Sequence, residues 1–554
     1  MSVKSMSAPS RARGLLRVPA QPARPGDGEE PTVTLLPARL DTAALADAVR
    51  SRRRVLLDEA AAEQMECSRK GLQQVLDRGE SVYGATTGFG PHVRYAADPD
   101  TEAQGSGLIA HLASGTGPYL APTVVRATVL VRANSLSRGH SAVRPDVVRA
   151  LLDMIDAGVV PAVPSTGSVG ASGDLVPLAH VARCLTGEGR VLDLPADDVD
   201  GEEQGDLSAS SRTRPAAQVL REHGLAPVRL DARDALALVN GTALSTALAA
   251  LAAARARLLL ERTLDTVGWL YAALGAQPQA LDPRLHAVRG QQPQAGAAES
   301  ISRVARALSG SSATPWSPAA AAHAGRPLQE VYSLRCAPQV LGPALALVDF
   351  ATATVDAELG GTSDNPVLVQ QGGRWEALHG GNFHAAASAT ASDLLSGALT
   401  QAAVLLERQV DVLANPATSH APLLLARFPG RQAGLAGAQL TASALVAEMR
   451  HACQWASTMS IPTNAGNQDI VPMAPLAGRT ALAQGLRLAG VLSVLALMVR
   501  QQQHLVAEGV ARGCLVDAPS WLPVIAGHDL DHETHLEIGA VTAAVLNAPI
   551  KEVT

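Results

Sequence analysis

Long segments rich in Ala and Leu constrain the fold of this chain more than any other feature. Apolar residues recur at helical spacing over residues 123–158, 229–275, 341–359, 384–413, 435–458 and 475–508. Ala and Leu are strong helix formers, and aromatic residues make up only 3% of the chain, so few segments favour strands. We therefore expect a mainly α protein whose long antiparallel helices form a bundle core, with glycine-rich loops between them.

The segments outside these helices indicate how the chain is organised. Residues 1–30 are rich in Ser, Pro, Arg, Gly and Glu and show no apolar period, which is typical of a disordered leader. We expect an N-terminal region with glycine-rich loops over 31–228, a central long-helix bundle over 229–513, and a C-terminal tail region, 514–554, that packs on the bundle. The acidic, Ser-rich stretch 193–214 is interpreted as a surface loop.

Charge and cysteine content argue against several classes of function. The chain has 45 Lys and Arg against 51 Asp and Glu, so it lacks the basic footprint of a nucleic-acid binder. Its five cysteines are widely spaced without a C-x-x-C pair, which predicts neither disulfides nor a zinc site and favours the cytoplasm. The longest strongly apolar run, 488–499, is shorter than the roughly 20 residues of a membrane span. We expect no nucleic-acid and no membrane partner.

Lysine is rare in this chain. It occurs only at Lys4, Lys70 and Lys551, although arginine is common. A pyridoxal phosphate enzyme needs a Schiff-base lysine, and a phosphate-binding loop needs a lysine after glycine. The sequence therefore disfavours both kinds of site.

The most unusual segment is STGSVGASGDLVPLAH, residues 165–180. Only small side chains allow the backbone to bend as sharply as this run of Gly, Ala and Ser suggests. A nucleophilic serine is disfavoured, because residues 170–174 do not match G-x-S-x-G. One interpretation is a helix N-terminus with Asp174 near the cap.

Six separated motifs support a more specific interpretation. Besides the Ala-Ser-Gly segment, they are YGATTGFG from Tyr83, ALVNGT with Asn240, QEVYSLRCAPQVLG from Gln329, HGGNF ending at Phe383, and TNAGNQDIV with Gln468. In order and spacing, over about residues 35–545, they resemble the histidine and aromatic amino-acid ammonia-lyase family. The resemblance implies an ammonia-lyase/aspartase-like helical fold.

The resemblance also implies a prosthetic group made from the chain itself. In that family the tripeptide that corresponds to Ala171, Ser172 and Gly173 cyclises autocatalytically and loses water to form 4-methylidene-imidazol-5-one (MIO). A small residue at Gly173 fits this cyclisation, because a bulky side chain would obstruct it. Neither a metal nor pyridoxal phosphate is then required.

Further residue roles follow from the same resemblance. Tyr83 would be the base that removes the β-proton, and Arg335 would bind the substrate carboxylate, which a planar guanidinium fits well. Catalytic Asn240 and Tyr332, together with Gln329, would line the prosthetic group, and Phe383 would pack on it. Plainer interpretations are a packed loop tyrosine, a surface ion pair, a structural hydrogen bond from Asn240 within a helix, and an ordinary core phenylalanine.

Two positions indicate the substrate. His111-Leu112 is similar to the His-Leu pair that tyrosine-accepting bacterial members place against the distal ring, where histidine-specific members have Ser-His. Gln468 stands where the histidine enzymes have Glu. Both favour tyrosine, although a satisfied core histidine is the alternative for His111.

We therefore expect an MIO-dependent lyase that converts an aromatic L-amino acid, tyrosine favoured, to p-coumarate and ammonia. A tyrosine 2,3-aminomutase that returns the amine to the β-carbon is the alternative at the same site. Departures from the family pattern near Gly360, Ala385 and Gln432 leave a third option, a non-catalytic helical scaffold. The resemblance further implies a homotetramer whose active sites combine loops from several subunits.

One cluster near the C-terminus has a different character. GHDLDHETH contains His528, His532 and His535, but it lacks H-E-x-x-H. We expect a solvated helix start there and no metal site.

Overall fold

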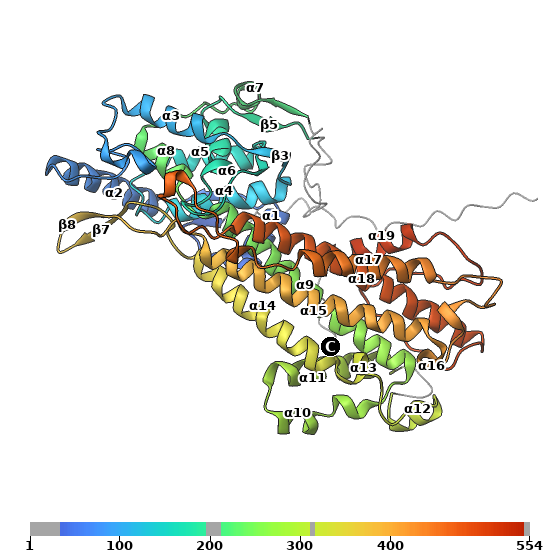
Figure 1. The fold of residues 1–554 in the computed structure, drawn as a ribbon. Helices are drawn as coiled ribbons and strands as arrows, with labels where there is room; N and C mark the ends of the chain where they lie inside the picture. The colour runs from blue at the N-terminus through green and yellow to red at the C-terminus, as the bar shows by residue number, and fades with distance from the viewer. Residues whose placement is uncertain (1–33, 195–211, 311–315, 548–554) are drawn as a thin grey trace, which may run out of the picture.

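The computed structural model describes residues 34–194, 212–310 and 316–547. The expected leader at 1–30, most of the expected loop at 193–214 and the last seven residues of the chain lie outside this range. Within it the protein is an elongated, mainly α molecule: a group of short helices sits at one end of a bundle of long ones (Figure 1). The fold class expected from the sequence is confirmed.

Short elements make up the N-terminal region. Its helices are α1 (Thr42–Arg50), α2 (Glu59–Asp77), α3 (Thr101–Leu112), α4 (Pro122–Leu136), α5 (Pro145–Asp156), α6 (Leu175–Leu185), α7 (Ala216–Glu222), α8 (Ala232–Val239) and the 3-10 turn Gly90–Arg94. Its strands are β1 (Thr34–Leu36), β2 (Val55–Leu57), β3 (Thr116–Tyr119), β4 (Pro164–Thr166), β5 (Arg190–Leu192) and β6 (Thr213–Pro215). β1 and β2 pair in parallel, whereas β3–β4 and β5–β6 are antiparallel.

The long helices form the bundle. They are α9 (Ala243–Leu274), α11 (Gln292–Leu308), α14 (Ala337–Leu359), α15 (Ala386–Ala414), α17 (Ala436–Ala452) and α18 (Ala474–Ala507). α9 is buried along nearly its whole length, because α4, α11, α14, α15 and α18 all pack against it. Its Ala-rich sequence suits this position, since small side chains let neighbouring helices approach closely from every direction.

Shorter elements complete the bundle region. They are α10 (Pro283–Arg289), α12 (Pro318–His323), α13 (Tyr332–Arg335), α16 (Pro416–Ser419), α19 (His535–Asn547), the antiparallel hairpin β7 (Val367–Gln371) and β8 (Arg374–Leu378), and 3-10 turns at Pro278–Leu281, Leu423–Leu425, Ala456–Thr458 and Asn464–Gly466. α19 lies against α18 and α9 through the buried residues Val541 and Val545.

Two of the expected helices are interrupted. The segment 123–158 contains α4, which ends at Leu136, and α5, which begins at Pro145 after Arg144 takes the extended conformation that a residue before proline favours. The segment 229–275 is divided into α8 and α9 by a break at Asn240–Thr242. This second break shapes the candidate active site.

By length and composition alone, four helical segments of the described chain could cross a membrane: Ala232–Leu274, Ala337–Leu359, Ala386–Ala414 and Ala474–Ala507. The expectation that no segment would reach this length and hydropathy is wrong. In the first segment 94% of the most apolar window is buried inside the fold, but in Ala337–Leu359 only 33% is. α14 therefore exposes apolar surface that this chain does not cover.

Candidate active site

The Ala171-Ser172-Gly173 tripeptide lies in a sharp turn before α6. Gly170 and Gly173 both have φ of +73°, in the left-handed region that favours glycine. A Cβ atom at Gly173 would lie 2.4 Å from the carbonyl oxygen of Gly241, so no side chain fits there. The backbone N–H of Asp174 donates to the same carbonyl at 2.8 Å. The tripeptide is thus pressed against the break between α8 and α9.

Asp174 anchors this turn to α9. Its fully buried carboxylate accepts hydrogen bonds from the backbone N–H and the hydroxyl of Ser245, both at 2.8 Å, and from the Ser168 hydroxyl at 3.2 Å. Burial raises the pKa of Asp174 to about 6, although these hydrogen bonds oppose the shift. Asp174 is the N-cap residue of α6, as the sequence suggests, but its side chain bonds to α9 and the Ser168 hydroxyl and makes no capping bond to α6.

Asn240 lies in the helix break and faces the tripeptide. Its side-chain amide donates to the carbonyl of Ser172 at 2.8 Å, while its Oδ1 is buried without a hydrogen-bond partner. We expected Asn240 within a continuous helix, but it follows the last residue of α8. The break turns its side chain toward Ser172.

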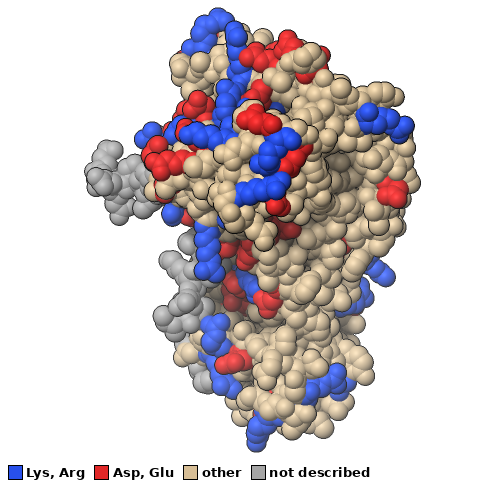
Figure 2. All heavy atoms as spheres, turned by 90° about the vertical axis from the view of Figure 1, so that its left-hand side faces the viewer, with Lys and Arg blue, Asp and Glu red and all other residues tan. Residues whose placement is uncertain are grey.

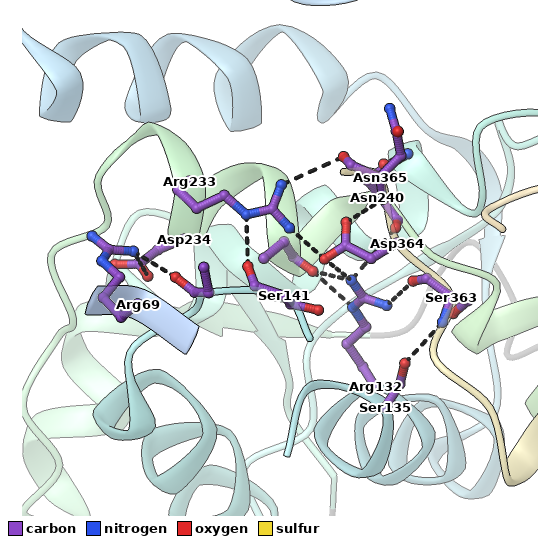
Figure 3. A network of polar contacts seen from close by, with 12 residues as sticks. Arg69, Arg132, Ser135, Ser141, Arg233, Asp234, Asn240, Ser363, Asp364 and Asn365 are labelled. Atoms are coloured by element: carbon purple, nitrogen blue, oxygen red, sulfur yellow. Dashed lines mark hydrogen bonds and ion pairs between the residues drawn. The ribbon is translucent and has the colours of Figure 1, made fainter. Parts of the chain in front are cut away.

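A buried arginine donates hydrogen bonds to main-chain carbonyls beside the break between α8 and α9 (Figure 3). Arg132 of α4 donates from Nε to the carbonyl of Ala237 at 2.9 Å and from Nη1 to the carbonyl of Ser363 at 2.8 Å. Asp364 lies 4.0 Å from Arg132 and 2.5 Å from Arg233, and all three side chains are buried. Burial lowers the pKa of Arg132 to about 10, so it remains a cation at neutral pH.

The sequence pattern does not indicate this network. Arg132 lies within the apolar segment 123–158, and its local neighbours give no sign of Asp364. The available signal was the arginine itself, because an unpaired guanidinium is not stable within an apolar helix. Its partners could not be identified, since Ala237 and Ser363 lie 105 and 231 residues away.

Gln468 contacts the central residue of the tripeptide. Its Nε2 donates to the Ser172 hydroxyl oxygen at 2.6 Å, and its Oε1 accepts a hydrogen bond from the Thr463 hydroxyl at 2.6 Å. The structure therefore brings Gln468, Asn240 and Ser172 together.

Tyr83 lies on a neighbouring glycine-rich loop. Its hydroxyl oxygen accepts the N–H of Gly90 at 2.7 Å, and its ring makes an edge-on contact with Phe89, with 6.4 Å between centroids. Burial raises the pKa of Tyr83, and the Gly90 N–H partly offsets this shift. The backbone N–H of Tyr83 donates to Nε2 of His379 at 3.1 Å, which joins this loop to the HGGNF loop.

The HGGNF loop also reaches the tripeptide turn. The N–H of Ala385 donates to the carbonyl of Gly170 at 3.1 Å, and Ala385 is fully buried. Phe383, two residues earlier, is half-buried. The loop that bears Phe383 is thus attached to the turn that bears Ser172.

His111 and Leu112 occupy the last turn of α3, which packs against α6 and α8. His111 is exposed and its Nδ1 lies 3.0 Å from the carbonyl of Gly107, whereas Leu112 is half-buried against the core. Gln104, on the same helix, donates to the carbonyl of Thr87 in the Tyr83 loop at 3.3 Å. The helix that carries the pair therefore contacts the Tyr83 loop through Gln104. His111 is exposed, so the interpretation as a core histidine is wrong.

Three predicted site residues lie elsewhere. Gln329, Tyr332 and Arg335 are in and just before α13, which packs against α14 and α15 at the end of the bundle opposite α6 and α8 (Figure 1). Tyr332 is 70% exposed, and the guanidinium carbon of Arg335 lies 4.8 Å from its ring centroid. A single chain does not bring these residues to Ser172.

Comparisons with known proteins agree with the fold and the motifs. Residues 40–516 match the model of the family described as "Aromatic amino acid lyase". A tyrosine ammonia-lyase of Cupriavidus metallidurans is 36% identical over 78% of this chain and 80% of its own length. A histidine ammonia-lyase of Shewanella pealeana is 37% identical over 85% of this chain and 87% of its own.

A solved tyrosine aminomutase from Streptomyces globisporus superposes with a TM-score of 0.81 and 29% identity, over 93% of this chain and 97% of that one. The chain belongs to the aromatic amino acid lyase family and is a carbon–nitrogen lyase. The histidine and tyrosine enzymes are about equally similar to it, so overall identity does not distinguish their substrates.

Proposed function

We propose that this protein is an MIO-dependent ammonia-lyase that acts on an aromatic L-amino acid, with tyrosine preferred, to give p-coumarate and ammonia. The observation that carries the proposal is the convergence of Asn240 and Gln468 on Ser172, at 2.8 and 2.6 Å, in a turn that excludes any side chain at Gly173. These contacts place amide groups on both the carbonyl and the hydroxyl of the serine that would be dehydrated.

The residues around the tripeptide fit the prosthetic group. Nδ2 of Asn240 faces the Ser172 carbonyl, while its buried Oδ1 has no hydrogen-bond partner among the described residues and would accept from the amine of a bound substrate. The hydrogen bond from the Asp174 N–H to the Gly241 carbonyl fixes the turn, while Ser172 stays partly exposed. When formed, the group supplies an electrophilic methylidene carbon for the substrate amine.

Tyr83 is proposed to remove the β-proton. A phenol is a strong enough base only as its phenolate, which the Gly90 N–H stabilises at 2.7 Å. Burial works in the opposite direction and raises the pKa of Tyr83. The loop thus keeps one donor on the oxygen that must carry the negative charge.

Tyrosine is preferred because of His111. If Nδ1 donates to the carbonyl of Gly107, the exposed imidazole presents Nε2 as an acceptor for a phenol hydroxyl. The amide of Gln468 adds no negative charge to the site. The histidine enzymes of this family have a negatively charged Glu at the position of Gln468, so the neutral amide disfavours histidine as the substrate.

The proposed site is completed by another subunit. Arg335 is proposed to bind the substrate carboxylate, but α13 lies at the far end of its own bundle (Figure 1). Figure 2 shows a broad surface with few Lys, Arg, Asp or Glu side chains down one side of the molecule, and in α14 the apolar Phe350 is 61% exposed. An apolar face of this kind is typical of subunit contacts. We propose a homotetramer in the cytoplasm, where the five free cysteines stay reduced.

The test of activity is incubation with L-tyrosine, L-phenylalanine and L-histidine, with separation of the products. We expect p-coumarate and ammonia from L-tyrosine as the fastest reaction, and no activity in Ser172→Ala. Release of β-tyrosine would instead identify an aminomutase, which the similarity to the Streptomyces enzyme favours as second candidate. An intact mass showing the uncyclised tripeptide in the parent protein would support the non-catalytic scaffold and contradict the proposal.

The test of shared sites is complementation. Ser172→Ala and Arg335→Ala are each expected to be inactive alone. Co-expressed in one assembly, they would restore about one site in four if Ser172 and Arg335 of a site come from different subunits. No recovery in a verified mixed assembly would contradict shared sites.

A further inference from the structure

Outside the candidate active site, His528, His532 and Glu537 form a compact cluster. The two histidines precede α19, and Glu537 lies in its first turn. Nε2 of His528 lies 2.9 Å from Oε1 of Glu537, and Nε2 of His532 lies 3.0 Å from Oε2. One potential ligand atom from each residue lies within 4.8 Å of the other two. Two imidazoles and a carboxylate are a common ligand set for zinc.

Both imidazoles face the same carboxylate. They are stacked, with centroids 3.5 Å apart and planes at 27°, and each Nε2 contacts one oxygen of Glu537, so one ring must turn for both lone pairs to meet a single ion. Nδ1 of His532 lies 3.4 Å from the carbonyl oxygen of Leu530. Metal-binding histidines commonly donate their second ring nitrogen to a backbone carbonyl, which leaves a lone pair on Nε2 for the ion.

The segment that carries the cluster is fixed in place. Gln501, a buried residue of α18, donates to the carbonyl of His528 at 2.8 Å and accepts its N–H at 2.9 Å. The carboxylate of Asp531 accepts the N–H groups of Ala433 and Gly434, both at 2.9 Å. A site held in this way loses little conformational entropy when an ion binds.

We propose that His528, His532 and Glu537 bind a divalent transition-metal ion of the zinc type. Two neutral imidazoles and one carboxylate carry a single negative charge, and the three side chains are 32%, 25% and 17% exposed, so that water can complete the coordination. The ion would join the start of α19 to the loop that Gln501 holds on α18. From the sequence we expect a solvated helix start and no metal at His528, His532 and His535. Of the three, only His535 lies apart from Glu537: its side chain is 66% exposed and pairs with Glu533.

Zinc titration of the full-length, chelator-treated protein tests the proposal. Calorimetry is expected to show one Zn²⁺ per chain, and the melting temperature is expected to rise with Zn²⁺ concentration because the ion binds the folded state. His532→Gln and Glu537→Gln should each weaken binding by about tenfold or more. His535→Gln is the matched control and should bind Zn²⁺ as the parent does.

Cobalt distinguishes this site from cysteine. Cys67 is exposed and could bind metal by itself. Co²⁺ at the proposed site should show ligand-field bands without a thiolate charge-transfer band, and both His532→Gln and Glu537→Gln should remove them. Absence of saturable binding, or unchanged Zn²⁺ affinity in both variants, would overturn the proposal and leave the cluster as an ion pair.

Discussion

The side-chain amide of Asn240 donates to the main-chain carbonyl of Ser172 at 2.8 Å, across a sequence separation of 68 residues. We expect Asn240→Ala to lower kcat by about 100-fold or more, the usual effect of removing one donor aimed at a reacting group. Steady-state kinetics measure this, with circular dichroism to verify the fold. Asn240→Asp keeps the size but loses the donor, so it should be similarly impaired. Parent-like kcat in either variant would refute a role for this amide in the reaction.

Gly173 and Gly290 provide a matched pair for the turn. Their φ angles are +73° and +74°, but a Cβ would meet Gly241 only at Gly173, and at Gly290 nothing lies within 4 Å. Gly290→Ala should therefore show only the left-handed strain, about 1–2 kcal/mol. Gly173→Ala should lose more stability and all activity. Denaturant unfolding and product assays measure both, and equal effects of the two substitutions would show that the contact with Gly241 is unimportant.

Arg132 should be far more important for stability than a surface arginine. Arg132→Met leaves the carbonyls of Ala237 and Ser363 without donors and Asp364 with only one cation. We expect the free energy of unfolding to fall by about 3 kcal/mol or more, and kcat to fall because Asn240 is no longer held. Arg149→Met is the control.

Arg149 forms an exposed pair with Glu59 at 3.2 Å, so its substitution should cost less than about 1 kcal/mol. Urea unfolding of both variants makes the comparison. If Arg132→Met were as mild as Arg149→Met, the buried network would not hold the helix break.

The helices and the motif residues were predictable because both are local. Ala and Leu at helical spacing predict α14, α15 and α18 within a few residues, and they predict where α9 ends but not where it begins. The glycine-rich turn before α6 is likewise visible in the neighbours of Ser172. The pattern of neighbouring residues was enough to predict these features.

The rest depends on contacts between distant residues. The break at Asn240 is stabilised by Arg132, 108 residues earlier. Asn240, Gly241 and Thr242 are weaker helix formers than the Ala and Leu residues around them, but the local sequence does not identify Arg132 as their partner. The place of Asp174 at the N-cap of α6 was predictable from its neighbours, but its partner Ser245 lies 71 residues away and was not. α13 lies far from Ser172 because the long helices of the bundle separate them. A short motif gives no information about this distance.

The proposed role of Tyr83 predicts a pH dependence of activity. Because burial raises its pKa, only a small fraction is phenolate at neutral pH. If the phenolate is the base, kcat/KM should increase about tenfold per pH unit until the pKa is approached. Tyr83→Phe should abolish most of the activity at every pH. A parent kcat/KM independent of pH in the neutral and mildly alkaline range would exclude a phenolate base.

Asp174 predicts a pH dependence of stability with a definite sign. Its pKa is about 6 in the folded protein and near its ordinary value of 3.8 when unfolded. Between these values the folded state holds a proton that the unfolded state has lost, so the contribution of Asp174 to stability falls as pH rises from 3.8 to about 6 and is constant above. Urea unfolding of the parent and Asp174→Asn across this range isolates the contribution. The difference, parent minus variant, should decrease with rising pH, whereas an increase would mean that the hydrogen bonds from Ser245 and Ser168 outweigh burial.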